Sequence, residues 1–146
     1  SNARCAHDIE LLKARRITHV LNVAGYEARG NYRKYRDHGI TVSELDARDI
    51  EGYPMLARHL GRVRKLVQAA KNANGKLVIH CVAGLNRSGV LCAAEYMLTT
   101  RCSVLDAVKH CRAKRGDLCV CNRSFQAQLV ALARTEGLLP TLDPTR

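Results

Sequence analysis

Cys81 and Arg87 are the residues of this 146-residue chain whose types and spacing most clearly predict chemistry. The residues between them are Val82, Ala83, Gly84, Leu85 and Asn86. An ionised cysteine is a nucleophile, and a guanidinium donates a planar pair of hydrogen bonds that matches two oxygens of a phosphate. The backbone N–H groups of the short loop could surround the remaining oxygens. The sequence therefore predicts a phosphate-binding loop with a nucleophile at its base.

Two regular elements are expected to hold this loop. Residues 76–80 form a short apolar run that predicts a buried strand, and residues 89–100 carry apolar side chains at helical spacing. Cys81 would then lie at a strand end beneath a helix N-terminus. The helix dipole, the loop amides and Arg87 would all favour the thiolate there.

Two residues close to Arg87 have predicted supporting roles. Gly84 would let the backbone turn tightly without a Cβ atom that blocks the ligand. Ser88 follows the arginine, and its hydroxyl is placed to donate a hydrogen bond to the sulfur of Cys81. Such a bond would make the thiolate a better leaving group.

The run from His80 to Gly89 resembles the Cys-x5-Arg signature of the protein tyrosine phosphatase superfamily, in the form with serine after arginine seen in its dual-specificity branch. Residues 17–23 resemble the first strand segment of that family, and residues 122–129 resemble the start of its last helix. The resemblance implies an α/β fold in which a mostly parallel central sheet is flanked by helices. It also implies a protein phosphatase that hydrolyses phosphotyrosine, and phosphoserine or phosphothreonine, through a cysteinyl-phosphate intermediate.

The resemblance further implies a general acid, because the departing alkoxide or phenolate is a poor leaving group unless it is protonated. Asp46 and Asp49 both follow the apolar segment at residues 40–45. The dual-specificity pattern places the acid four residues past the last strand hydrophobe, and counting from Leu45 selects Asp49. Asp46 would lie next to the strand end in a structural contact. Asp49 would protonate the leaving oxygen and then act as base toward water.

Other roles also follow from the resemblance. His80 would order the loop and tune the thiolate rather than act as a base. Asn22 would brace the loop from the neighbouring strand, or else would be a turn residue at a strand end. Arg115 lies near the place where the family carries an arginine that binds a second phosphate. The resemblance implies no cofactor and no metal.

The order of elements predicts one catalytic domain over residues 4–139. Residues 1–3 resemble a cloning scar, and residues 140–146 are expected to form a tail. The expected elements are a helix at 6–16, a strand at 18–23, a basic loop at 25–38, a strand at 40–45, a helix at 54–72, a strand at 76–80 and three further helices. Ligands of such sheets bind beyond the carboxyl ends of the strands, so one cleft could contain both Cys81 and Asp49.

The net charge of +11 favours acidic partners such as phosphorylated proteins. Two alternatives remain open. Asn86 before the arginine also resembles RNA 5′-phosphatases of the same superfamily, although Ser88, Asp49 and residues 122–129 favour the protein phosphatases. The second alternative is a non-catalytic module that binds phosphoproteins, which the intact Cys81 and Arg87 disfavour. The oligomeric state is left open, and no membrane span is expected, because no apolar run is long enough.

The cysteines indicate a reducing compartment, because there are seven and they form no compact disulfide framework. We therefore expect a cytoplasmic or nuclear protein. His110, Cys111, Cys119 and Cys121 raise zinc as a possibility, but no CxxC pair occurs and the spacing matches no familiar zinc module. Cys92 is expected to be either a redox partner of Cys81 or an ordinary buried helix residue.

Overall fold

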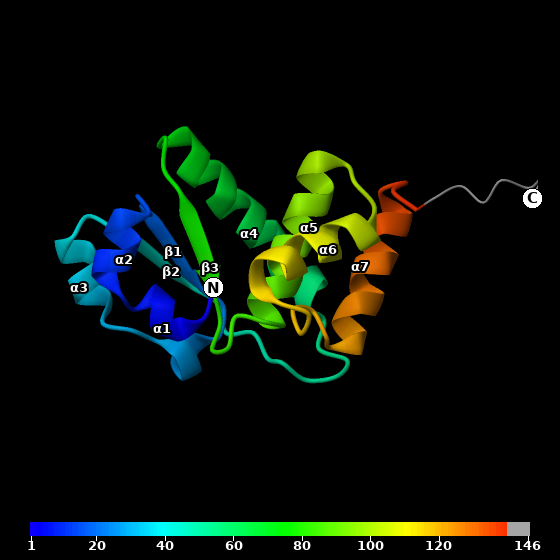
Figure 1. Ribbon diagram of the computed structural model, residues 1–146, viewed down its shortest axis with the longest axis horizontal. Coiled ribbons are helices and arrows are strands. Elements are labelled where there is room, and N and C mark those ends of the chain that lie inside the picture. Colours follow the sequence, from blue (N-terminus) through cyan, green and yellow to red (C-terminus); the bar gives the residue numbers. More distant parts are fainter. Residues whose placement is uncertain (140–146) are drawn as a thin grey trace, which may run out of the picture.

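A computed structural model describes residues 1–139. The elements follow one another as α1 (Ala3–Ala6), α2 (Ile9–Ala14), β1 (His19–Asn22), the 3₁₀ helix η1 (Gly25–Ala28), α3 (Tyr32–Asp37), β2 (Thr41–Glu44), α4 (Met55–Asn72), β3 (Leu77–His80), α5 (Arg87–Thr100), α6 (Val104–Arg115) and α7 (Arg123–Thr135). The sheet and the first three helices occupy one half of the molecule, and α5, α6 and α7 gather in the other (Figure 1). The helix α4 runs between the halves.

The sheet of the described chain has three strands in the order β2-β1-β3, and both pairings are parallel. Asn22 at the end of β1 is in register with Glu44 of β2 and His80 of β3. The carboxyl ends of all three strands therefore meet at one edge. The predicted parallel sheet flanked by helices is confirmed, and it brings the segments after β2 and β3 to the same edge.

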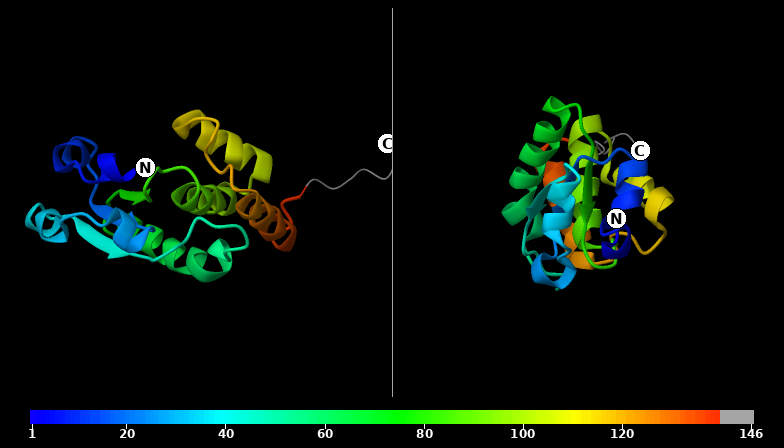
Figure 2. Two further views of the ribbon diagram at one scale, coloured as in Figure 1. Left: turned by 90° about the horizontal axis from the view of Figure 1, so that it is seen from below. Right: turned by 90° about the vertical axis from the view of Figure 1, so that its left-hand side faces the viewer.

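The two faces of the sheet are covered by different helices because successive side chains of a strand point to opposite faces. Val20 packs with Leu12 of α2 and Tyr35 of α3 in one buried cluster. Leu21 and Ile79 belong to the other cluster, with residues of α4 and α5. Figure 2 shows the sheet between α1 and α2 on one side and α4 on the other.

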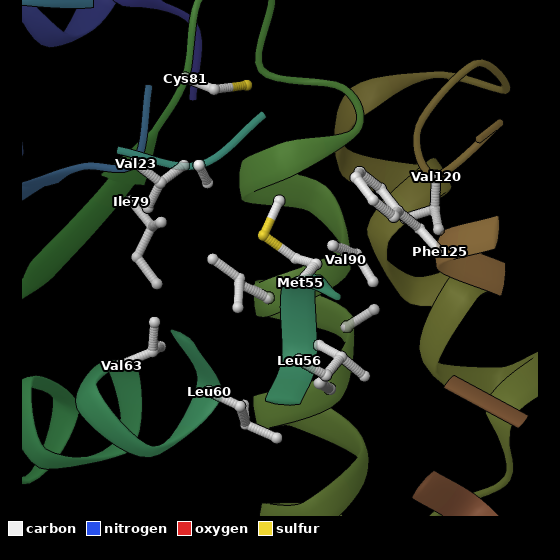
Figure 3. Packing of buried hydrophobic residues seen from close by; sticks show 14 of the residues in the cluster. Val23, Met55, Leu56, Leu60, Val63, Ile79, Cys81, Val90, Val120 and Phe125 are labelled. Carbon is white, nitrogen blue, oxygen red and sulfur yellow. The ribbon is translucent and has the colours of Figure 1, made fainter. Parts of the chain in front are cut away.

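The helix α5 lies at the centre of the helical half and packs against α4, α6 and α7. Its buried residues include Val90, Leu91, Ala93, Ala94, Met97 and Leu98. Figure 3 shows Val90 beside Met55 of α4 and Phe125 of α7. Apolar contacts on more than one side therefore hold α5 in place. The phosphate loop, which ends at the first residue of this helix, is thus attached to a rigid element.

Two sequence expectations about the first 40 residues were wrong. The segment at 25–38 is not a loop throughout, because it contains η1 and α3. Asn31 caps α3 by accepting a hydrogen bond from the amide of Lys34 at 3.2 Å. The helix also buries the side chain of its own residue Tyr35. The single helix expected at 6–16 is two short helices, α1 and α2, because Asp8 caps a new helix by accepting from the amide of Leu11 at 3.0 Å.

The expectations about the two ends of the chain stay predictions. Residues 1–3 pack against the phosphate loop, where the amide of Ala3 donates to the carbonyl of Val82 at 2.9 Å. The tail expected at 140–146 lies outside the described residues. Within residues 1–139, no helix combines the length and the apolar character needed to cross a bilayer.

Candidate active site

Cys81 follows β3 directly, and residues 82–86 then turn back to the start of α5. Its Sγ atom receives a hydrogen bond from the amide of Gly84 at 3.2 Å and lies 3.3 Å from the hydroxyl oxygen of Ser88. Gly84 has a φ of +74°, a left-handed conformation that favours glycine. The sulfur points toward the start of α5 (Figure 3), and the residue is buried. This is the loop that the sequence predicts.

The surroundings of Cys81 favour its ionised form. Burial by itself acts to raise the pKa of the thiol, but the hydroxyl and amide of Ser88 and the amide of Gly84 oppose it, and the charge of Arg87 adds to their effect. The net result is a pKa below the ordinary value of a cysteine thiol. A donor and a nearby cation both stabilise the thiolate more than the thiol.

Arg87 is buried at the first position of α5, and its guanidinium is held from one side. Both terminal nitrogens donate to the carboxylate of Glu27, at 3.1 and 3.3 Å, and Nη1 also donates to the carbonyl of Ala47 at 3.3 Å. Its Nε atom is buried and has no partner among the residues that the structure describes. A buried donor is expected to have a partner, so Nε is available to an oxygen of a bound phosphate.

His80 occupies the last position of β3 and is buried. Burial lowers its pKa to about 4, and the nearby His7 adds to the effect. The ring is therefore neutral at pH 7, and its Nδ1–H donates to the carbonyl of Cys81 at 3.1 Å. The contact holds the backbone at the nucleophile, and tuning of the thiolate by His80 stays a prediction.

Asp49 lies beside the phosphate loop, and amide groups from two different segments hold both of its carboxylate oxygens. Oδ2 accepts from Nδ2 of Asn86 at 3.0 Å, and Oδ1 accepts from Nδ2 of Asn122 at 3.0 Å. Asp46 instead pairs with Ala24 in an isolated antiparallel bridge just past β1. Both aspartates line a cleft of about 360 Å³ together with Arg87, but Asp49 is the one bonded to the phosphate loop.

The hydrogen bonds of the Asn22 side chain go to the turn after β1 and to α3 rather than to the phosphate loop, which agrees with the alternative role of a strand-end turn residue. Its Oδ1 accepts from the amide of Ala24 at 2.9 Å, and its Nδ2 donates to the carbonyl of Gly25 at 2.8 Å. Nδ2 also donates to the Tyr32 hydroxyl at 3.0 Å. The Tyr32 hydroxyl in turn donates to Glu44, which also pairs with Arg29. Asn22 thus joins the turn after β1 to α3 and β2.

Arg115 lies against the phosphate loop, with its Nε donating to the carbonyl of Gly84 at 3.4 Å. The contact places the end of α6 next to the phosphate loop. Binding of a second phosphate by Arg115 stays a prediction.

Of the remaining thiols, that of Cys121 contacts the phosphate loop, where its Sγ donates to Oδ1 of Asn86 at 3.4 Å. Burial raises the pKa of Cys92, which disfavours the thiolate that a redox reaction needs. Cys111 and Cys119 are buried in the apolar core, whereas Cys121 is exposed. Over residues 1–139, no three histidine, cysteine or carboxylate side chains are grouped as a metal ion would need.

Sequence reasoning missed two residues of the site, Glu27 and Asn122. Glu27 lies on η1, inside the segment expected to be a basic loop, and nothing in the local sequence pairs it with Arg87. Asn122 was recognised only as part of a helix start, where it caps α7 by accepting from the amides of Ser124 and Phe125 at 3.0 and 3.2 Å. An asparagine before a helix predicts an N-cap from the local sequence. The partner of its Nδ2 donor is Asp49, which is distant in sequence and which no local pattern predicts.

Comparison with known proteins agrees with this geometry. Residues 1–135 match the family described as "Dual specificity phosphatase, catalytic domain". Over 118 residues the chain is 32% identical to Dual specificity protein phosphatase 26 of Bos taurus and of Homo sapiens, covering 81% of this chain and 55% of each relative. The chain therefore spans about half the length of these relatives.

Solved structures show the same fold. Human DUSP28 superposes with a TM-score of 0.80 at 23% identity, covering 94% of this chain and 88% of that one. A human tyrosine phosphatase-like serine/threonine/tyrosine-interacting protein superposes with a TM-score of 0.79 at 19% identity, covering 93% and 90%. At these identities the likeness describes the fold alone. The family match over residues 1–135, together with the Cys81 loop, shows that the chain belongs to the dual specificity phosphatase catalytic-domain family.

Proposed function

We propose that this protein hydrolyses phosphotyrosine, and phosphoserine or phosphothreonine, in phosphorylated proteins. One observation carries the proposal: the sulfur of Cys81 receives hydrogen bonds in a loop that is closed by Arg87 and bonded to Asp49. A nucleophile, a phosphate-binding cation and a proton donor therefore lie at one edge of the sheet. This combination suits transfer of a phosphoryl group from an ester to sulfur.

In the first step, the thiolate of Cys81 attacks phosphorus in line with the departing oxygen. The S–P bond forms as the P–O bond to the substrate breaks, and Asp49 gives its proton to the leaving oxygen. The loop amides and Arg87 stabilise the charge that spreads over the three remaining phosphoryl oxygens. The unpartnered Nε of Arg87 supports this role, because it is a buried donor beside the loop.

In the second step, water attacks the cysteinyl-phosphate and its proton goes to Asp49, now a carboxylate. The electron pair of the S–P bond returns to sulfur, and inorganic phosphate leaves. The hydroxyl of Ser88 lies 3.3 Å from the sulfur and can donate to it as negative charge returns. Both steps therefore use the same groups, with Asp49 acting first as acid and then as base.

The two alternatives are less well supported. The family match favours a protein phosphatase over an RNA 5′-phosphatase. The fold is shared with a protein whose description names it an interacting protein, so fold alone does not separate an enzyme from a binding module. The site does favour an enzyme, because Cys81, Arg87, Ser88 and Asp49 are all present. The Ser88 hydroxyl lies within hydrogen-bond distance of the Cys81 sulfur, and Asp49 is bonded to Asn86 of the loop.

The test is phosphate release, under reducing conditions, from a phosphotyrosine peptide, a phosphothreonine peptide and a 5′-triphosphorylated RNA. Cys81→Ser is the blank, and Cys102→Ser controls for loss of a thiol elsewhere. We expect release from both peptides that the blank abolishes and the control retains. Preferential release from RNA would overturn the assignment in favour of a nucleic-acid phosphatase. Peptide binding without release from any of the three substrates would instead identify a binding module.

A further inference from the structure

Asn86 connects three segments that are far apart in the sequence. Asn86 stands just before α5, but its side chain makes no capping hydrogen bond to that helix. Oδ1 accepts hydrogen bonds from the amides of Cys121 and Asn122, at 2.9 and 3.0 Å, and Nδ2 donates to Asp49 at 3.0 Å. One side chain therefore joins the phosphate loop to the segment after β2 and to the start of α7.

Asn122 completes the arrangement from the other side. Its Nδ2 donates to Oδ1 of Asp49 at 3.0 Å, while its own Oδ1 caps α7. Each oxygen of the Asp49 carboxylate thus has one amide donor, and the two donors come from different elements. Since Asp49 is exposed on a segment without regular structure, these two contacts are what define where its carboxylate lies relative to Cys81.

The chemistry of residue 86 is specific to asparagine. The side chain must accept from two backbone N–H groups and donate to a carboxylate at the same time, which requires a carbonyl oxygen and an N–H group on one short side chain. A serine hydroxyl has one hydrogen and one oxygen for all of these contacts. An aspartate would retain the acceptor but lose the donor, and it would place a second negative charge beside Asp49.

We propose that Asn86 is a positioning residue for Asp49, and that with Asn122 it sets how efficiently a proton reaches the leaving oxygen. The inference rests on the proposed function, since it assigns Asn86 a part in the acid step of that reaction. The first step needs the acid most when the leaving group is weakly acidic, and needs it little when the leaving group departs readily without a proton. A defect in positioning Asp49 therefore appears as a dependence of rate on the leaving group.

The test measures kcat/KM for aryl phosphates whose phenols range from strongly acidic, as in a difluorinated umbelliferyl phosphate, to weakly acidic, as in phenyl phosphate. Asn86→Ala is expected to lower kcat/KM for phenyl phosphate by about ten- to a hundredfold, part of the gain that general acids provide. The loss for the fluorinated substrate should be about twofold or less. Asn122→Ser, which keeps a residue able to cap α7, should show the same trend.

A double-mutant cycle separates this role from a structural one. If Asn86 acts through Asp49, then Asn86→Ala should cost nothing further in an Asp49→Asn background. Alkylation of Cys81 by iodoacetamide should proceed equally in Asn86→Ala and wild type, because the thiolate keeps its own donors. Asn72→Ala, on the exposed side of α4, serves as the control and should match wild type with every substrate.

Each outcome decides between distinct conclusions. Equal losses on all substrates, or a full loss in the Asp49→Asn background, would overturn the role of Asn86 while leaving the proposed function intact. An absence of turnover by wild type relative to Cys81→Ser, even with the fluorinated substrate, would overturn the proposed function and this inference with it.

Discussion

At the residue scale, the guanidinium of Arg87 is oriented by the carboxylate of Glu27, which lines the same cleft. Glu27 bonds both terminal nitrogens, and its own side chain is 62% exposed. An exposed carboxylate adds little to stability because water screens the pair. We infer that Glu27 instead orients the guanidinium, because it binds both terminal nitrogens of Arg87 and leaves Nε without a partner in the described chain.

We expect Glu27→Ala to lower kcat/KM for a phosphotyrosine peptide by about fivefold, because Arg87 then loses the carboxylate that orients both of its terminal nitrogens. The melting temperature should change little. Steady-state kinetics and thermal unfolding measure the two effects, with Glu10→Gln on α2 as the control. A rise in kcat/KM would contradict this interpretation, because it would mean that Glu27 competes with the substrate phosphate for Arg87.

Ser88 has a second measurable effect at this scale, through the pKa of Cys81. Its hydroxyl and amide help to hold that pKa below the ordinary thiol value, so the thiolate persists at pH values where a free cysteine is protonated. Ser88→Ala removes the hydroxyl donor. We expect the pH midpoint for alkylation of Cys81 to move upward and kcat to fall about tenfold or more, since a hydrogen bond to a charged group is worth about 1.5–3 kcal/mol.

The alkylation is followed by mass spectrometry of the peptide that contains Cys81, so that the other thiols do not interfere. Ser43→Ala on β2 provides the matched control, and its midpoint should equal that of wild type. An unchanged midpoint in Ser88→Ala would show that the amides of the loop and Arg87 are sufficient to hold the thiolate.

At the element scale, a side chain of α7 makes hydrogen bonds with the backbone at the start of α4. Pro54 precedes α4, which begins without a side-chain cap. Gln128 of α7 supplies the missing partner: its Oε1 accepts from the amide of Leu56 at 3.1 Å, and its Nε2 donates to the carbonyl of Tyr53 at 2.7 Å. A side chain from a distant helix thus satisfies the amide of Leu56, which the first turn cannot satisfy internally. It also adds a second hydrogen bond to the carbonyl of Tyr53, which already accepts from the amide of Met55 at 2.8 Å.

Gln128→Ala is expected to lower the free energy of unfolding by about 1–2 kcal/mol, because it removes a cap and leaves the partly buried amide of Leu56 without a partner. Urea unfolding followed by circular dichroism measures the change. Gln68→Ala on the exposed side of α4 is the control and should cost less than about 0.5 kcal/mol. A loss no greater than that of the control would show that water replaces the side chain at these groups.

Sequence predicted the elements that carry strong local signals, and missed those that depend on partners far along the chain. The apolar run of β3, the turn at Gly84 and the start of α7 are encoded locally and lie where expected. In contrast, α3 is stabilised by burial of Tyr35 against α2 and β1, which a polar and basic segment does not reveal. Asn22 likewise bonds to Tyr32 rather than to the loop, a choice that depends on where α3 packs.

At the scale of the whole molecule, His80 links the stability of the fold to pH. Its pKa is about 4 in the folded protein, below the value of 6.5 for a free histidine, so the unfolded chain binds the proton more readily. The contribution of His80 is fully present above pH 6.5 and is lost as the pH falls toward 4. Over that interval, wild type should lose about 3 kcal/mol through this residue.

His80→Asn tests this effect, because an asparagine amide can donate to the carbonyl of Cys81 without titrating. We expect its free energy of unfolding to fall less steeply than that of wild type between pH 6.5 and 4, whatever its absolute stability. His38→Asn, at an exposed position, is the control and should keep the wild-type slope. Parallel slopes for wild type and His80→Asn would contradict the assignment.

The buried position of α5 also affects how a ligand would be detected. Leu91 and Ala94 lie within a helix packed by α4, α6 and α7, so we expect their amide hydrogens to exchange with deuterium only when the surrounding helices separate. A phosphate bound at the adjoining loop stabilises the folded state by mass action. Occupancy of the loop would therefore slow deuterium uptake along the whole of α5, including amides that no ligand touches.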